Sequence, residues 1–388
     1  MYLAHKLLPA LFSTLLVAVL FFQVQESSAN ESNKNKQKRG GPPPFMMVNS
    51  PKFNSDGTVT FRIWAPSATD VKLNAGGLLN GAQAVLAKTS EGVWSTTVKP
   101  SKAGLYKYQF SVDQVNTVDP KNIITYHNSN LILIPGKEAE FFAIKQVPHG
   151  AVHKHLYHSD SIGTERPLHV YTPPDYYSNR EKKYPVLFLF HGSGDTDESW
   201  IRIGKADAIL DNLIAAGLVK PMIVVIPYGH TVEPGTSGWP FVQEKGDFIE
   251  DFLHDIVPFV ERTYRVSFKP KDRALAGLSM GGYHSLKIGL NHLDKFGNIG
   301  VFSWGKGEEF LEKHAPAILA NPEEVNRQLE QLWIACGKSD FLFKGPIDLD
   351  ATLTKLGIKH TFVVSEGGHT WSNWRQYLHQ YAQLLFED

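Results

Sequence analysis

The chain of 388 residues contains a single cysteine, Cys336, so it cannot form an internal disulfide bond. It also lacks an excess of charge of either sign, because 39 basic residues balance 39 acidic residues. A balanced net charge gives no general attraction for nucleic acid or for an anionic membrane surface. There is no glycine-rich phosphate loop and no internal repeat. These absences argue against a disulfide scaffold, a nucleic-acid-binding protein, a nucleotide-binding protein and a repeat protein.

Metal-binding motifs are missing as well. His153, His155 and His158 lie close together in the sequence, but no carboxylate partner and no HExxH motif accompanies them. They fall where the first strand of the second half of the chain is expected, and we interpret them as the polar face of that strand. We therefore expect neither a metal nor a cofactor.

Long apolar runs are scarce, and the run near the N-terminus predicts a targeting segment. Residues 1–29 combine Lys6, an apolar stretch at 7–22 and small residues at 27–29, which is the order of a signal peptide. The stretch is short for a membrane span, and an uncleaved anchor is the alternative. Residues 30–44 are polar and basic and are typical of a solvated linker. We expect export to the periplasm or the medium, cleavage after Ala29, and no membrane association afterwards.

Residues 45–145 are predicted to form a small all-β domain. Polar and apolar residues alternate at 58–64 and again at 105–112, which is the two-residue period of half-buried strands. Short strands at this spacing favour an immunoglobulin-like sandwich. Trp64 and Trp94 either pack in its core or form a platform for sugar. No cluster of catalytic residue types is present, so we expect this domain to be dispensable for chemistry.

Residues 146–388 change to an alternation of strands and helices. The continuous apolar runs at 185–190 and 222–226 are typical of strands that are covered on both faces. Asp247 resembles a helix start, and Pro258 is expected to kink the helix that follows. Further strands are predicted at 299–303, 332–336 and 360–364, and further helices at 206–216, 283–290 and 373–386. This alternation predicts a parallel, doubly wound sheet.

One Gly-x-Ser-x-Gly motif, at 277–281, lies between a predicted strand and a predicted helix. Strand, glycine-flanked serine and helix together make a nucleophile elbow, in which Ser279 stands above the sheet beside the amide of Met280. The glycines Gly277 and Gly281 leave room for neighbouring backbone. The alternative is an ordinary Gly-Ser turn that joins a strand to a helix.

A serine nucleophile needs a base, and on this architecture an acid and then a histidine should follow it in the chain. Asp340 follows one predicted strand and His369 follows the last, where open α/β sheets place their sites. We predict His369 as the base and Asp340 as the residue that orients it. Glu308 and Glu309 are the rival acids.

The oxyanion of the intermediate needs two backbone donors. We predict that Met280 supplies one amide and that Ser193 supplies the second, with Gly192 as the alternative, because a glycine-rich loop directly follows the 185–190 strand. His191 is interpreted as a structural residue that orients this loop.

Several tryptophans follow predicted strand ends in the second half of the chain. Trp200, Trp239, Trp304 and Trp371 do so, and Trp374 begins the last helix. Such rings can form the floor of a pocket for an aromatic acyl group or a sugar ring, or they can pack in the core.

Taken together, the motifs resemble carbohydrate esterase family 1 and its esterase D-like relatives. The matching segments are LHVYTPP at 168–174, HGSG at 191–194, GLSMGG at 277–282 and GGHTW at 367–371. The resemblance implies an α/β-hydrolase fold, a serine esterase and feruloyl or acetyl esters of xylan as substrates. The preceding domain resembles an early-set, glycogen-binding-module-like domain. Tyr228 departs from the asparagine that relatives often have before Gly229, and it lies in a loop expected near the substrate.

The sequence therefore predicts a secreted Ser-His-Asp esterase whose partner is an acylated plant polysaccharide or oligosaccharide. Trp200, Tyr228, Trp239, Trp304 and Trp371 are the predicted substrate contacts. Hydrolysis of a ferric catecholate siderophore ester is the alternative among enzymes. A carbohydrate-binding protein with an inert hydrolase fold is the alternative of another class.

Overall fold

The structure is a computed structural model that describes residues 43–231 and 247–387. The predicted signal peptide, nearly all of the predicted linker and Trp239 lie outside the described residues. Within these two ranges, no helix has both the length and the apolar character that a bilayer span requires.

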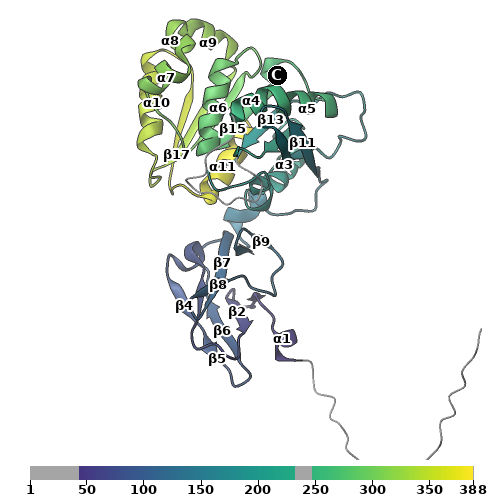
Figure 1. Ribbon diagram of the computed structural model, residues 1–388, viewed down its shortest axis with the longest axis vertical. Helices are drawn as coiled ribbons and strands as arrows, with labels where there is room; N and C mark the ends of the chain where they lie inside the picture. The colour runs from purple at the N-terminus through teal and green to yellow at the C-terminus, as the bar shows by residue number, and fades with distance from the viewer. Residues whose placement is uncertain (1–42, 232–246, 388) are drawn as a thin grey trace, which may run out of the picture. The chain divides into compact units, whose positions relative to one another are not determined.

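The first part of the described chain is all-β, as predicted (Figure 1). It begins with a short helix, α1 (Pro44–Met47), and includes a 3₁₀ turn, η1 (Gly76–Leu79). Its strands are β1 (Lys52–Phe53), β2 (Val59–Trp64), β3 (Val71–Asn74), β4 (Gln83–Val85), β5 (Ala87–Lys88), β6 (Val93–Val98), β7 (Gly104–Val112), β8 (Val115–Thr117), β9 (Thr125–Tyr126) and β10 (Ser129–Ile134). They form two sheets with the orders β1-β2-β6-β5 and β4-β3-β7-β10-β9, and β8 pairs with β7. All strand pairs in this part are antiparallel.

Apolar side chains from both sheets meet in one core, which makes this part a sandwich. Phe61 of β2 and Phe110 of β7 are fully buried in it. Trp94 joins the same core and donates its indole N–H to the Ala65 carbonyl, 2.9 Å away. Trp94 is therefore a packing residue, whereas Trp64 is 38% exposed.

The second part is built on one sheet of eight strands. They are β11 (Ala151–Ser159), β12 (Thr164–Thr172), β13 (Val186–Phe190), β14 (Ile223–Pro227), β15 (Arg273–Leu278), β16 (Asn298–Phe302), β17 (Gln331–Gly337) and β18 (Thr361–Ser365). The order across the sheet is β11-β12-β14-β13-β15-β16-β17-β18. The two strands β11 and β12 pair in antiparallel fashion, and all pairs from β14 to β18 are parallel. The predicted doubly wound α/β sheet is confirmed.

Helices cover both faces of this sheet (Figure 1). Their bounds are α2 (Ser199–Arg202), α3 (Ala206–Ala215), α4 (Phe248–Asp251), α5 (Val257–Thr263), α6 (Met280–Asn291), α7 (Glu308–His314), α8 (Pro316–Ala320), α9 (Pro322–Gln328), α10 (Lys344–Lys355) and α11 (Trp371–Ala382), with a 3₁₀ turn η4 (Pro270–Asp272). Residues of α3 and α11 pack on one face, and residues of α4, α5 and α6 pack on the other. Because both faces are covered, the central strands are apolar throughout.

The helical segment that starts at Asp247 is interrupted just before Pro258. Asp247 caps α4, because its carboxylate accepts the Ile249 amide at 2.8 Å. A π-helical turn, η3 (Phe252–Ile256), separates α4 from α5, and Pro258 lies in the first turn of α5. Proline has no amide hydrogen to donate within a helix, and the irregularity predicted near Pro258 is present as a π turn just before it.

Buried side chains of the first domain pack in the same clusters as side chains of the second domain. Phe142, in the 3₁₀ segment η2 (Lys137–Phe142), packs in the core that contains α3 and α11. The Arg375 guanidinium of α11 lies 4.7 Å from the centre of the Phe142 ring. Tyr126 of β9 and Leu131 of β10 pack with Ile203 in a smaller cluster. The first domain is thus packed against elements of the second.

Candidate active site

Ser279 occupies a strained turn between β15 and α6. Its φ of 54° lies in the left-handed region, which a serine rarely adopts. Its amide donates to the Phe302 carbonyl of β16 at 2.9 Å, and this bond helps to hold the turn. A side chain on Gly277 would place its Cβ 2.5 Å from the Gly281 carbonyl oxygen, and one on Gly281 would come within 2.6 Å of the Phe190 carbonyl oxygen. The two glycines are therefore required by close backbone packing.

Asp340 and His369 are brought together at the carboxyl ends of β17 and β18. The His369 Nδ1 atom lies 2.9 Å from Asp340 Oδ2 and 3.0 Å from Oδ1. The Leu342 amide donates to Asp340 Oδ1 at 2.9 Å. Burial by itself raises the pKa of the Asp340 carboxyl, but hydrogen bonds, the largest from His369, outweigh burial and lower the pKa below its ordinary value. Asp340 is thus held ionised in contact with the imidazole.

Within the described part of the chain, the Ser279 hydroxyl makes no hydrogen bond to His369. The structure therefore forms the Asp340–His369 half of the predicted triad and leaves the serine–histidine bond unmade. Ser279 is only partly buried, which leaves it accessible to a substrate. Hydrogen bonds between catalytic groups are commonly long in free enzymes and tighten in the substrate complex.

The predicted oxyanion loop, residues 191–194, lies directly beside Ser279. A Cβ on Gly192 would meet Leu278 Cδ1 at 2.5 Å and Ser279 Cβ at 3.2 Å. Ser193 is exposed, and its amide makes no hydrogen bond to another described residue. Met280 begins α6, and the first amides of a helix have no partner inside it. The backbone amides of Ser193 and Met280 are thus available to bind a developing negative charge on the substrate.

His191 fixes the start of this loop. Its Nδ1–H donates to the Gly192 carbonyl at 2.8 Å, and its Nε2 accepts the Gly229 amide at 2.8 Å. The ring is buried, and burial lowers its pKa to about 3. His191 is therefore neutral with a fixed tautomer, an arrangement suited to the orienting role expected of it.

Arg166 and Asp251, which the sequence analysis did not single out, hold the 228–230 segment in place. The fully buried Arg166 pairs with Asp251 at 3.1 Å and donates to the carbonyls of Tyr228 and His230 at 2.6 and 2.7 Å. The His230 Nε2 atom in turn accepts the Gly194 amide at 3.2 Å. An isolated arginine in a strand gives no sequence signal for such a contact, because its partners are far away in the chain.

The structure contradicts one of the predicted aromatic contacts, and the others stay predictions. The prediction that Trp200 contacts substrate is wrong, because the side chain is fully buried and its indole N–H donates to the Phe190 carbonyl at 3.0 Å. Trp304 is half-buried and packs against Phe310 of α7, with ring centres 4.9 Å apart. Trp371 is half-buried and packs edge-on against Trp200, with ring centres 5.1 Å apart.

Two further rings lie near the site. Tyr228 is half-buried and packs against His191, with ring centres 5.8 Å apart, and burial raises the pKa of its phenol. Phe341, which the sequence analysis missed, is 77% exposed and lies 4.5 Å from the His369 ring. A single phenylalanine in a loop has no motif that could have indicated this position. Phe341 is thus an exposed aromatic surface beside the predicted base.

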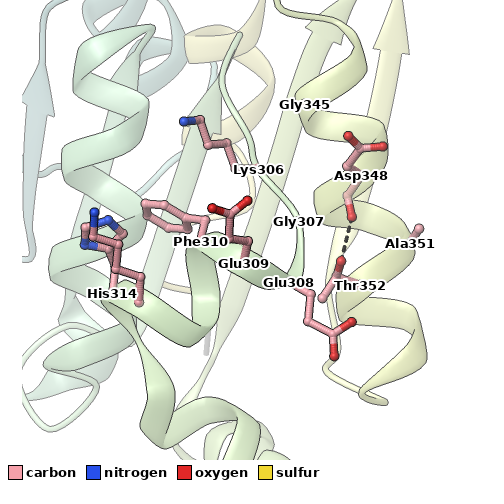
Figure 2. Close-up of a pocket in the computed structure, with 11 residues that line it drawn as sticks. Lys306, Gly307, Glu308, Glu309, Phe310, His314, Gly345, Asp348, Ala351 and Thr352 are labelled. Atoms are coloured by element: carbon pink, nitrogen blue, oxygen red, sulfur yellow. Dashed lines mark hydrogen bonds between the residues drawn. The ribbon is translucent and has the colours of Figure 1, made fainter.

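The rival acids lie elsewhere. Glu308 pairs with Lys355 of α10 at 2.8 Å, and it lines a cavity of about 630 Å³ between α7 and α10 (Figure 2). Glu309 lines the same cavity, and none of the predicted triad residues does so. The competing assignment of the acid to Glu308 or Glu309 therefore has no support in the geometry.

The three histidines near residue 155 do not gather into a metal site. They lie on β11, where His153 contacts Thr172 Oγ1 at 3.1 Å and His158 contacts Glu165 at 2.9 Å. His155 bonds to the Tyr264 hydroxyl at 2.5 Å. Among residues 43–231 and 247–387, no group of three or more histidine, cysteine or acidic side chains is placed to hold a metal ion.

Comparison with known proteins places both domains in families. Residues 159–384 match the family model "Putative esterase", and residues 49–125 match carbohydrate-binding module 48, the isoamylase N-terminal domain. An endo-1,4-β-xylanase/feruloyl esterase of Xylanibacter ruminicola is 33% identical over 352 residues. The match covers 87% of this chain but only 46% of that relative.

Solved structures show the same fold. The CE1 ferulic acid esterase of Anaeromyces mucronatus, solved with ferulic acid, is 26% identical with a TM-score of 0.55, and the match covers 64% of this chain and 95% of that one. The enterobactin esterase of Shigella flexneri has a TM-score of 0.60 over 89% of this chain and 98% of that one, and its 16% identity shows likeness of fold alone. Because the esterase model covers more than half of the 388 residues, the chain belongs to the putative esterase family, a carboxylic-ester hydrolase family with the α/β-hydrolase fold, and carries a carbohydrate-binding-module-48 domain in front of it.

Proposed function

We propose that this chain is an exported serine esterase that removes feruloyl groups from plant cell-wall polysaccharide such as xylan, with acetyl groups as the second acyl class. The observation that carries the proposal is the hydrogen bond between Asp340 and His369 at the same edge of the sheet as the strained Ser279. A carboxylate, an imidazole and a serine in this chain order are the parts that acyl transfer requires.

In the proposed mechanism, Ser279 Oγ attacks the ester carbonyl while His369 Nε2 takes its proton. Asp340 keeps the proton of the imidazole on Nδ1 and stabilises the imidazolium. The amides of Met280 and Ser193, with Gly192 as the alternative to Ser193, bind the oxyanion. His369 then protonates the leaving alcohol, which leaves an acyl group on Ser279. Water attacks this acyl-enzyme with His369 as base, which releases the acid and restores the serine.

The substrate class is supported by the relatives and by the exposed ring beside the base. The name of the Xylanibacter relative includes feruloyl esterase, and the Anaeromyces enzyme was solved with ferulic acid. Phe341 offers a flat apolar surface 4.5 Å from His369, which suits a phenolic acyl group or a sugar ring better than an acetyl group. We assign Tyr228, Trp304 and Trp371 as further substrate contacts.

The test is product analysis with the full chain on three substrates: methyl ferulate, methyl acetate and feruloylated, acetylated xylan. We expect a higher kcat/KM for methyl ferulate than for methyl acetate, and release of ferulate from xylan. Ser279→Ala should lower kcat by about 10⁶-fold, whereas the matched control Ser178→Ala, on an exposed turn, should leave it unchanged.

Three outcomes would change the proposal. A ferulate-to-acetate ratio well below one would make the protein an acetyl esterase. Cleavage of a ferric catecholate triester, without release of ferulate or acetate from xylan, would replace the polysaccharide by a siderophore. A loss of less than tenfold in folded Ser279→Ala would remove this serine from its role.

Export is part of the proposal and is supported by the order of charged, apolar and small residues in 1–29. We expect N-terminal sequencing of the protein from its native host to begin at Asn30. A mature chain that begins at Met1 in the cytoplasm would contradict export.

A further inference from the structure

The segment that follows the oxyanion loop is bound by a side chain of the other domain. We propose that Tyr126, in β9 of the N-terminal sandwich, is a positioning residue for the esterase reaction, because its hydroxyl fixes the 192–199 segment that carries the second oxyanion donor. This inference rests on the proposed function and adds to it a role for the first domain in catalysis.

The Tyr126 hydroxyl joins two residues of the segment at once. It donates to Asp195 Oδ1 at 2.5 Å, and it lies 2.7 Å from Ser199 Oγ. Since its only proton is given to the carboxylate, the serine hydroxyl must be the donor in the second bond. Ser199 Oγ also accepts the Thr196 amide at 2.7 Å. One buried phenol thus closes a network that spans both ends of the 195–199 stretch.

The same segment is hydrogen-bonded to the residue that packs against Ser279. The Asp195 amide donates to the Gly192 carbonyl at 3.2 Å, which closes the turn that contains Ser193. Gly192 itself packs against the nucleophile, since a Cβ there would lie 3.2 Å from Ser279 Cβ. The orientation of the Ser193 amide therefore depends on a turn whose far end is held by Tyr126.

The position of Tyr126 is set by its own domain and by a second contact. Tyr126 is 4% exposed, and β9 pairs with β10 within the sandwich. The neighbouring Thr125 carbonyl accepts two bonds from the Arg202 guanidinium of α2, at 2.8 and 3.1 Å. Strand β9 is thus held by β10 within the sandwich and by Arg202 of the esterase domain. This inference is opposed to the expectation from the sequence that the first domain is dispensable for chemistry, and the variants below distinguish the two.

The test compares Tyr126→Phe with wild type in the full chain, on methyl ferulate. Misplacing a transition-state donor costs rate rather than ground-state binding, so we expect kcat to fall about 10- to 100-fold while KM changes less than about threefold. The matched control is Tyr106→Phe, which removes a tyrosine hydroxyl elsewhere in the same domain. That hydroxyl donates to the Lys102 carbonyl. Its kcat should stay within about twofold of wild type.

Two further measurements separate positioning from a general loss of structure. A boronic acid that forms a tetrahedral adduct with Ser279 should bind Tyr126→Phe more weakly by about the factor lost in kcat, whereas ferulate, the product, should bind equally well. Asp195→Ala breaks the same hydrogen bond from the other side and should reproduce the loss, and it replaces Tyr126→Phe if that variant does not fold. Asp195→Asn, which keeps an acceptor for the phenol, should lose less activity than Asp195→Ala.

The outcomes for the two proposals are distinct. If wild type hydrolyses methyl ferulate while folded Tyr126→Phe or Asp195→Ala stays within about twofold of it, this inference alone is wrong. A change in KM with kcat and boronate affinity unaltered would also refute it. If wild type shows no hydrolysis above Ser279→Ala, the proposed function fails and this inference fails with it.

Discussion

Asp340→Asn is the sharpest test of the proposed acid, because the substitution keeps the shape of the side chain and replaces one acceptor oxygen by a donating NH₂ group. In the structure, the Leu342 amide donates to Asp340 Oδ1 at 2.9 Å, and His369 Nδ1 lies 2.9 Å from Oδ2 and 3.0 Å from Oδ1. An asparagine must keep its carbonyl oxygen toward the Leu342 amide, so its NH₂ group takes the place of Oδ2. That NH₂ group then donates to His369 Nδ1.

The expected magnitude follows from this exchange. An imidazole that accepts at Nδ1 carries its proton on Nε2, and in that tautomer it cannot take the proton of Ser279. The loss of the correct tautomer in a Ser-His-Asp site is about 10⁴-fold in kcat. This factor corresponds to about 5.4 kcal/mol of transition-state stabilisation. Since the carboxamide fits the same space, the fold should remain intact.

The assay is kcat for methyl ferulate at neutral pH, with circular dichroism and a thermal melt to show that the variant is folded. The matched control is Glu308→Gln, since Glu308 was the rival acid and pairs instead with Lys355. We expect the control to stay within about twofold of wild type, because an exposed ion pair contributes little. A folded Asp340→Asn that retains more than a tenth of wild-type activity, or a large loss in Glu308→Gln, would refute the assignment.

Three other predictions concern the elbow, the acid and a buried ring. Gly281→Ala brings a Cβ within 2.6 Å of the Phe190 carbonyl oxygen, so urea titration should show a loss of about 1–3 kcal/mol in the free energy of unfolding. Gly76→Ala, where nothing lies within 4 Å, is its control, and equal stability of the two variants would contradict the packing argument. The lowered pKa of Asp340 means that its charged form stabilises the fold above the ordinary aspartate pKa of about 4 and that this stability is lost as pH falls through the lower folded value. The free energy of unfolding of wild type, measured by urea titration, should therefore fall relative to that of Asp340→Asn below about pH 4. If the difference between the two proteins stays constant down to pH 2, this prediction is wrong. Trp200→Phe removes a buried donor to the Phe190 carbonyl and should lower the free energy of unfolding by about 1–3 kcal/mol, while the ferulate-to-acetate ratio of kcat/KM stays unchanged. A changed ratio with unchanged stability would restore Trp200 as a substrate contact.

Local sequence was sufficient for the elbow. The turn at Ser279 requires glycines at fixed offsets, because Cβ atoms there would collide with backbone, and such a requirement is written into neighbouring residues. The chain order of serine, acid and histidine follows from the order of strands in a doubly wound sheet. These two facts allowed Asp340 and His369 to be paired before any geometry was known.

The same reasoning failed for one aromatic side chain, Trp200, and missed another, Phe341. Trp200 follows a strand end, as a pocket residue would, yet it is fully buried, whereas the unremarked Phe341 is 77% exposed beside His369. Position along the chain places a residue near the carboxyl edge of the sheet but does not give the direction of its side chain. That direction depends on packing against α11, which is distant in sequence.

From the sequence alone, the two domain types, the doubly wound sheet and the candidate triad could be derived, because each depends on hydrophobic periodicity or on residues at short fixed spacings. Only the tertiary structure revealed the contacts that hold the oxyanion segment. Tyr126 bonds to Asp195 and Ser199 across 69 and 73 residues of chain, from a strand of a different domain. No local pattern encodes such a partner, because the hydrogen bond exists only after both domains have folded and packed together.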